Sequence, residues 1–222
     1  MINNVDVESF FENNAPLCSF RELSKNSKGK PLVENDIRAY AYETFATTLF
    51  SSNPLQMVDA LYIKDNCIWL IEFKGGFNLK ISLKDFDMDR WYCKSAKKIC
   101  EEGAKYFKEN QVHKVNELIN SLHGKLLETY ATFSRIILPQ CTSCTQQYKV
   151  KYVSVVDANS DPLGNIENVL GSVSEFDENT ENLLPRLKAS LSKYRIVDAN
   201  GEPLFFDEIL VWSIEDFNRN IT

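Results

Sequence analysis

The most regular pattern of apolar and polar positions lies in the first third of the chain. Two apolar runs, 55–63 and 67–74, are separated by a short polar segment centred on Asp65 and Asn66. Apolar runs that flank such a polar pair are typical of a β-hairpin. With a two-residue turn, Leu61 faces Leu70 and Asp59 faces Glu72 across the ladder.

Because side chains alternate between the two faces of a strand, the hairpin divides into two apolar faces and belongs in the centre of a sheet. One face also carries the charged residues at its open end. That face is expected to hold Asp59, Leu61, Ile63, Ile68, Leu70, Glu72 and Lys74, and the other Val58, Ala60, Tyr62, Trp69, Ile71 and Phe73.

Helical and strand patterns alternate along the rest of the chain. Residues 24–30 are polar and predict an exposed loop, and residues 155–163 and 196–204 each predict a strand that enters an Asn-containing turn. Helices are expected over 5–13, 32–50, 83–108, 112–136 and 181–193, and further strands over 77–82, 149–156 and 205–212. This order predicts an α/β (α+β) fold in which helices flank a central mixed β-sheet.

Composition narrows the functional classes. The chain of 222 residues suits a single domain, and its net charge of −6 argues against a protein that coats nucleic acid by bulk charge. It still allows an enzyme that reaches phosphates through a bound metal and a local basic patch. No apolar window is long enough for a membrane helix, and the N-terminal residues do not resemble a secretion signal.

The six cysteines predict reduced thiols in the cytoplasm rather than a disulfide framework. Cys141 and Cys144 form the one closely spaced pair. A zinc site would need two more ligands, so the pair is interpreted as a loop feature.

Three charged groups converge at the open end of the hairpin, namely Asp59, Glu72 and Lys74. Facing residues have Cβ atoms roughly 5 Å apart, and two carboxylates at that distance need a shared proton, a salt bridge or a metal. Two hypotheses are equally open on these grounds. One is a Mg²⁺ site, since Mg²⁺ prefers carboxylate oxygens. The other is a salt-bridge network that closes the hairpin.

The motif formed by Asp59, twelve intervening residues and Glu72-Phe73-Lys74 resembles that of the PD-(D/E)XK nuclease superfamily. The core of that family, the restriction endonuclease-like fold, is a helix, three antiparallel strands, a second helix and a further strand. The order of elements expected over residues 32–157 matches it, and residues 158–222 would form a C-terminal extension. Val58 departs from the family pattern, which commonly has proline at that position.

The resemblance implies a catalytic set of Glu43, Asp59, Glu72 and Lys74. Asp59, Glu72 and the backbone carbonyl of Phe73 would bind Mg²⁺, for which Mn²⁺ could substitute. Glu43, on the expected first helix, would hold metal-bound water or a second ion. Lys74 would orient the attacking water and stabilise developing charge. Glu43 could equally be a solvated helix residue, and Glu34 is a weaker alternative to it.

Basic residues on the expected 83–108 helix offer a contact to nucleic acid, through Arg90, Lys94 and Lys97. The spacing of Lys97 with Glu101 and of Lys98 with Glu102 favours a solvated helix face instead.

The implied function is a Mg²⁺-dependent DNA nuclease in defence, repair or mobile-element biology. An inactive binding or scaffold protein on the same fold and an RNA-directed nuclease are the alternatives. DNA or RNA is the expected substrate. The acidic charge and the unassigned C-terminal third favour a protein partner or a homodimer that completes the substrate groove.

Overall fold

The computed structural model describes residues 6–49, 55–75, 92–93, 98–141, 148–157 and 183–221. These residues form an α/β fold around a six-stranded mixed sheet with strand order β1-β2-β3-β4-β7-β8. The pairs β1–β2, β2–β3 and β3–β4 are antiparallel, whereas the pairs β4–β7 and β7–β8 are parallel. The strands are β1 (Leu17–Ser19), β2 (Arg38–Ala41), β3 (Ala60–Lys64), β4 (Cys67–Lys74), β7 (Lys149–Val156) and β8 (Glu208–Ser213).

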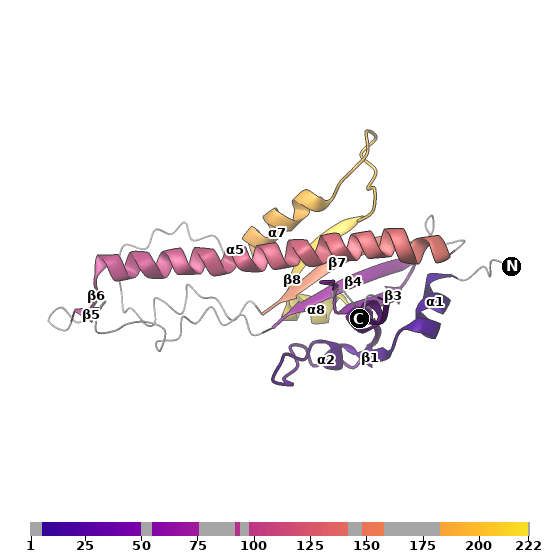
Figure 1. Cartoon of the computed structure of the whole chain (residues 1–222), viewed down its shortest axis with the longest axis horizontal. Helices are drawn as coiled ribbons and strands as arrows, with labels where there is room; N and C mark the ends of the chain where they lie inside the picture. The colour runs from indigo at the N-terminus through magenta and orange to yellow at the C-terminus, as the bar shows by residue number, and fades with distance from the viewer. Residues whose placement is uncertain are drawn as a thin grey trace.

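Helices cover both faces of the sheet (Figure 1). The longest is α5 (Glu101–Thr132), which crosses one face beside α7 (Leu183–Leu191), while α2 (Phe20–Leu23) and α8 (Ile214–Asn220) lie on the opposite face. The remaining helices and strands are α1 (Val7–Asn14), α3 (Tyr42–Leu49) and the short strand pair β5 (Tyr92–Cys93) and β6 (Lys98–Ile99). A π-helix, η1 (Phe133–Ile137), and two 3-10 helices, η2 (Leu138–Gln140) and η4 (Ser192–Tyr194), complete the described elements. None of the helices in these parts of the chain is long and apolar enough to cross a membrane.

The β3–β4 hairpin has the predicted register. Leu61 pairs with Leu70, and the turn residues Asp65 and Asn66 have φ angles of 50° and 58°. Two successive positive φ angles are the mark of a tight hairpin turn whose twist matches that of the flanking strands. The register therefore follows from local turn chemistry, and it fixes which side of the sheet each later residue of β4 faces.

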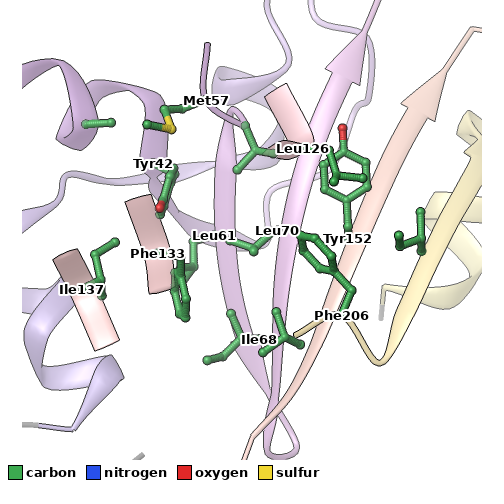
Figure 2. Close-up of a cluster of buried hydrophobic side chains, with 14 of the residues drawn as sticks. Tyr42, Met57, Leu61, Ile68, Leu70, Leu126, Phe133, Ile137, Tyr152 and Phe206 are labelled. Atoms are coloured by element: carbon green, nitrogen blue, oxygen red, sulfur yellow. The ribbon is translucent and has the colours of Figure 1, made fainter. Parts of the chain in front are cut away.

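The two faces of the hairpin enter two separate cores, as the alternation predicts. Figure 2 shows the larger core, where Leu61, Leu70 and Tyr152 pack against Leu126 of α5 and Phe206. The smaller core, under α2 and α8, contains Ala60, Ile71, Phe73, Phe20 and Phe217. Val58 is the exception: it joins the larger core with Met57, because β3 begins only at Ala60 and the alternation does not extend back to it.

The predicted helix over 32–50 is wrong in its first half. Residues Arg38–Ala41 form β2, which pairs with β1 and β3, and α3 begins only at Tyr42. Ala39, Tyr40 and Ala41 are all buried in the sheet. Burial between two neighbouring strands overrides the helical spacing of apolar residues in this segment.

The boundaries predicted for the two central helices are also wrong. Tyr92–Cys93 and Lys98–Ile99 are strands, and the helix begins after Cys100, whose Sγ accepts a hydrogen bond from the backbone N–H of Gly103. The expected Lys98–Glu102 helical pair is thereby excluded. The expected break between 108 and 112 does not occur, since no glycine or proline lies between residues 104 and 123.

Other predictions are confirmed. The strand over 149–156 is β7, the helix over 181–193 is α7 followed by η4, the strand over 205–212 is β8, and the helix over 5–13 is α1. The turn expected in 196–204 is present, with Gly201 at a φ of 86°. Helix α8 was missed, although Ser213 caps it by accepting from the N–H of Asp216. The strand expected over 77–82 lies outside the described residues.

Candidate functional site

The structure brings Asp59, Glu72 and Lys74 together at one edge of the sheet. Because β3 and β4 are antiparallel, the residue that precedes β3 lies beside the end of β4. Oδ2 of Asp59 accepts a hydrogen bond of 2.7 Å from the backbone N–H of Phe73. The ladder of β3 with β4 ends at Ala60 and Ile71, so Asp59 is anchored to β4 by its side chain and not by the strand pairing expected with Glu72.

Glu72 is the most unusual residue of this cluster. Its side chain is 1% exposed, and Lys74 Nζ lies 3.1 Å from Oε1 while Lys125 Nζ lies 2.9 Å from Oε2. The 2.9 Å contact with Lys125 is both an ion pair and a charge-assisted hydrogen bond. Because a carboxylate oxygen can accept more than one partner, Glu72 is balanced by two ion pairs at short range but retains capacity to accept further hydrogen bonds or a metal.

Lys125 was not identified from the sequence. It projects from α5 with 12% of its side chain exposed, and its Nζ also lies 3.5 Å from Oδ1 of Asp59 and 3.9 Å from Oε1 of Glu43. A signal was present, since Leu118, Leu122, Lys125 and Thr129 recur at the spacing of one helix face. A lysine within an otherwise buried stripe predicts a buried partner of opposite charge.

Glu43 reaches the cluster from α3, in the first turn and not near the end of a longer helix as expected. The N–H of Tyr42 donates to the carbonyl of Asp59 over 3.1 Å, which holds the start of α3 against the strand end. The Glu43 side chain is 50% exposed and marks the open side of the site. Glu34, the weaker alternative, instead pairs with Arg21 at 2.9 Å.

A row of polar side chains on α5 holds the two strand ends in place. Ser121 Oγ lies 3.4 Å from Lys74 Nζ, and Thr129 Oγ1 accepts from the N–H of Val58 over 3.1 Å. Between them, the carboxylate of Glu128 accepts from the N–H of Gln56. Since these bonds bracket Lys125 along the helix, they fix the position of its backbone against the strand ends.

Burial dominates the electrostatics of the cluster. Burial raises the pKa of Glu72 to about 8, assisted by the charge of Asp59 and opposed by Lys125 and Lys74. Burial also raises the pKa of Asp59, against the opposing effects of Lys125 and the Phe73 N–H. Burial acts to lower the pKa of Lys125, but the two carboxylates outweigh it and the net shift is upward.

A buried phenol lies near the carboxylates. Tyr152 of β7 is fully buried, and its hydroxyl lies 3.5 Å from the carbonyl of Leu122 and 3.4 Å from Oγ of Ser154. Burial, with the charge of Glu72 as the next contribution, raises its pKa well above the usual range. Tyr152 therefore stays protonated and contributes an uncharged side chain beside the carboxylates.

The donor set for a metal is small. Among the residues that the structure describes, no group of three or more His, Cys, Asp or Glu side chains is arranged to hold a metal ion. Mg²⁺ is nevertheless commonly held by only one or two carboxylates with water completing its shell. Asp59 and Glu72 supply such a pair of carboxylates, whose oxygens here face the ammonium groups of Lys74 and Lys125 and so line a place suited to a cation.

Several predicted residues fall outside the described part of the chain. Arg90, Lys94 and Lys97, the candidate nucleic-acid contacts, are among them, as is Cys144. Cys141 is buried in the larger core, which agrees with a structural role for that side chain.

Comparisons with protein-family models, with curated proteins and with solved structures found no match.

Proposed function

We propose that the protein is a metal-dependent nuclease that hydrolyses DNA phosphodiester bonds, with a restriction endonuclease-like core of the PD-(D/E)XK type. The observation that carries the proposal is the buried carboxylate of Glu72, placed beside Asp59 and Lys74 at one sheet edge. Burying charged groups costs several kcal/mol per ion, and apolar replacements of a buried ion pair are often neutral or stabilising. A gain in stability alone thus explains the cluster poorly, whereas metal-dependent hydrolysis requires carboxylates and a lysine placed close together.

The order of elements supports the same proposal. Helix α3 precedes the β3–β4 hairpin, α5 lies between β4 and β7, and β7 is parallel to β4. These elements follow the order implied by the sequence motif, with a shorter first helix and the β2 strand before it, while the third antiparallel strand, expected over 77–82, lies outside the described residues. Helix α5 also closes the site from one side, through Lys125 and Ser121.

In this proposal, Asp59 and Glu72 hold Mg²⁺ or Mn²⁺ together with the carbonyl of Phe73, and Glu43 binds water at the open side. When bound, such an ion polarises a phosphoryl oxygen and lowers the pKa of a nearby water. Lys74, held between Glu72 and Ser121, supplies a compact positive charge that orients the attacking water and stabilises charge on the phosphate.

The test is a cleavage assay on supercoiled, linear and single-stranded DNA, with Mg²⁺, Mn²⁺ or EDTA. Lys74→Ala is compared with Lys151→Ala, a lysine paired with Glu208 at 2.7 Å across β7 and β8. Metal-dependent cleavage that is lost only in Lys74→Ala supports the proposal. Equal cleavage by both variants, or none by the folded wild type on any substrate, contradicts it. Competition with RNA separates a DNA nuclease from an RNA-directed one.

One observation favours a second function, a binding or scaffold protein. Lys125 already pairs with both Asp59 and Glu72, as it would in a purely structural network. In that case Lys74→Ala leaves the function intact and the protein binds no Mn²⁺. Titration calorimetry with Mn²⁺ on the wild type and on Asp59→Ala distinguishes the two functions.

A further inference from the structure

The ammonium group of Lys125 lies where a metal ion bound by this site would be expected. Its ammonium group lies within 4 Å of carboxylate oxygens from three separate segments, namely Glu43 at 3.9 Å, Asp59 at 3.5 Å and Glu72 at 2.9 Å. Lys74, by contrast, contacts Glu72 alone among these carboxylates and is held on its other side by Ser121.

We infer that Lys125 is a tethered cation that competes with the divalent metal for Asp59 and Glu72, so that metal binding requires its ammonium group to leave the site. The inference rests on the proposed metal site and adds a determinant of its affinity. It commits to a divalent ion of the Mg²⁺ and Mn²⁺ class as the competing ligand, because the oxygens concerned are all carboxylate oxygens.

The ammonium group and a metal ion would need the same space and carry charge of the same sign. A Mg²⁺ ion binds carboxylate oxygens at about 2.0–2.1 Å. An ion bound to Oε2 of Glu72 and Oδ1 of Asp59 would then lie close to the present position of the ammonium group, which contacts both oxygens. Two cations in contact repel strongly where water is scarce, and Glu72 is buried. The two occupants therefore exclude each other.

The structure also offers a route by which the ammonium group can leave. Lys125 is tethered by a flexible four-carbon stem, and its third carboxylate contact, Glu43, is half exposed on the open side of the site. Rotation of the stem toward Glu43 keeps the ammonium paired while it clears Asp59 and Glu72. Lys74 has no such exposed carboxylate among its contacts, which are with buried Glu72 and with Ser121 of α5.

Exchange of the two cations changes the charge that the site presents to a substrate. With all groups ionised, the cluster holds three carboxylates and two ammonium groups, which leaves one formal negative charge. Addition of a divalent ion converts this to one formal positive charge. Metal loading therefore shifts the formal charge of the cluster by two positive units, toward a charge that attracts a phosphate.

The test measures Mn²⁺ affinity by titration calorimetry for the wild type, Lys125→Met, Lys125→Arg and Lys151→Met. Lys151 is a matched control, because it is similarly buried and also paired with a glutamate. We expect Lys125→Met to bind Mn²⁺ at least about tenfold more tightly than the wild type. The substitution removes the ammonium charge that competes with the ion, and the loss of one close charge–charge repulsion changes affinity by about that factor. Lys125→Arg and Lys151→Met should bind like the wild type.

A second measurement on the wild type avoids any risk that Lys125→Met fails to fold. Lysines are acetylated with and without Mn²⁺, and the peptides are quantified by mass spectrometry. The labelling of Lys125 should rise severalfold with Mn²⁺, whereas that of Lys151 should not change. Unchanged labelling of Lys125 at millimolar Mn²⁺ would overturn the inference.

The outcomes separate this inference from the proposed function. Equal Mn²⁺ affinity in the wild type and Lys125→Met, with metal-dependent cleavage in both, overturns the inference and leaves the nuclease proposal standing. Tighter binding by Lys125→Met without cleavage of any substrate supports the inference and contradicts the nuclease proposal. Absence of Mn²⁺ binding in both proteins contradicts both.

Discussion

Lys125 Nζ lies 2.9 Å from Oε2 of Glu72, and this contact joins the centre of α5 to the end of β4. It is the shortest of the ion pairs that bind the long helix to the site, and it involves the most deeply buried carboxylate in that cluster. Because a charge in such a position is costly even when paired, the free energy of unfolding should depend on the protonation state of Glu72.

The first prediction concerns pH. The pKa of Glu72 is about 8 in the folded protein, above the value of 4.5 for an unperturbed glutamate. A raised folded-state pKa means that the stabilising effect is fully present below pH 4.5 and is lost as pH rises through 8. We expect wild-type stability to fall by a few kcal/mol between pH 5 and 9, at ~1.4 kcal/mol for each pKa unit.

Urea denaturation of Glu72→Gln at pH 5, 7 and 9 checks this. The variant should lose most of the pH dependence, because glutamine keeps the shape of the protonated acid. Glu208→Gln, at an exposed carboxylate paired with Lys151, is the control and should keep the wild-type slope. The same slope for Glu72→Gln and the wild type would contradict the assignment of the pH dependence to Glu72.

The second prediction separates the two roles of Asp59. Its Oδ2 accepts the Phe73 N–H, and its Oδ1 faces Lys125. Asp59→Asn keeps an acceptor for the N–H but removes the charge, whereas Asp59→Ala removes both. We expect Asp59→Ala to lower the free energy of unfolding by about 1–3 kcal/mol, because a partly buried N–H is left unpaired, and Asp59→Asn to lower it by less.

Both variants should lose Mn²⁺ affinity to a similar extent, as measured by calorimetry, since only the charged carboxylate suits the ion. Stability is followed by thermal unfolding on the same samples. Full Mn²⁺ affinity in Asp59→Asn would show that Asp59 serves the hairpin and not the metal site.

Local chemistry was enough to predict the hairpin, and long-range packing was needed for the rest of the site. The turn at Asp65 and Asn66 and the alternation of β4 are local, so register and faces could be derived from the sequence. They place Glu72 on the same face as Leu70 and Leu61, and α5 covers that face. The positions of Glu72 and Lys74 at the end of this face could therefore be derived from the sequence, and so could the proximity of Asp59 to them.

The contribution of α5 could not be derived in the same way. Lys125 lies 53 positions after Glu72 in the chain, and nothing local indicates which turn of a long helix meets the strand ends. Similarly, β2 was missed because its apolar residues fit a helical spacing and only its pairing with β1 and β3 makes it a strand. Both features depend on contacts between distant segments, which one sequence does not reveal.

The third prediction tests whether the turn sets the register of the site. Asn66 has a φ of 58°, a conformation that asparagine and glycine tolerate and that β-branched residues resist. Asn66→Gly should leave stability within about 0.5 kcal/mol of the wild type or raise it, whereas Asn66→Val should lower it by about 1–2 kcal/mol. Chemical denaturation gives both values. Equal stability of the two variants would mean that strand pairing alone fixes the hairpin.

The last prediction uses two adjacent leucines of α5 to measure how far the site depends on helix packing. Leu126 is fully buried in the larger core (Figure 2), whereas Leu127 is 47% exposed. Leu126→Ala should lower the free energy of unfolding by about 2–5 kcal/mol through lost burial and a cavity. Leu127→Ala, with the same chemical change, should cost under about 1 kcal/mol, because it faces solvent.

Because Leu126 follows Lys125 directly, its truncation should also loosen the ion pairs of Lys125 with Asp59 and Glu72. Under conditions where Leu126→Ala remains folded, the acetylation of Lys125 should rise relative to Leu127→Ala. Destabilisation without a change in Lys125 labelling would mean that the ion pairs hold the helix independently of the apolar contact. That result would place the origin of the site's geometry in its charges, with the core of α5 contributing stability alone.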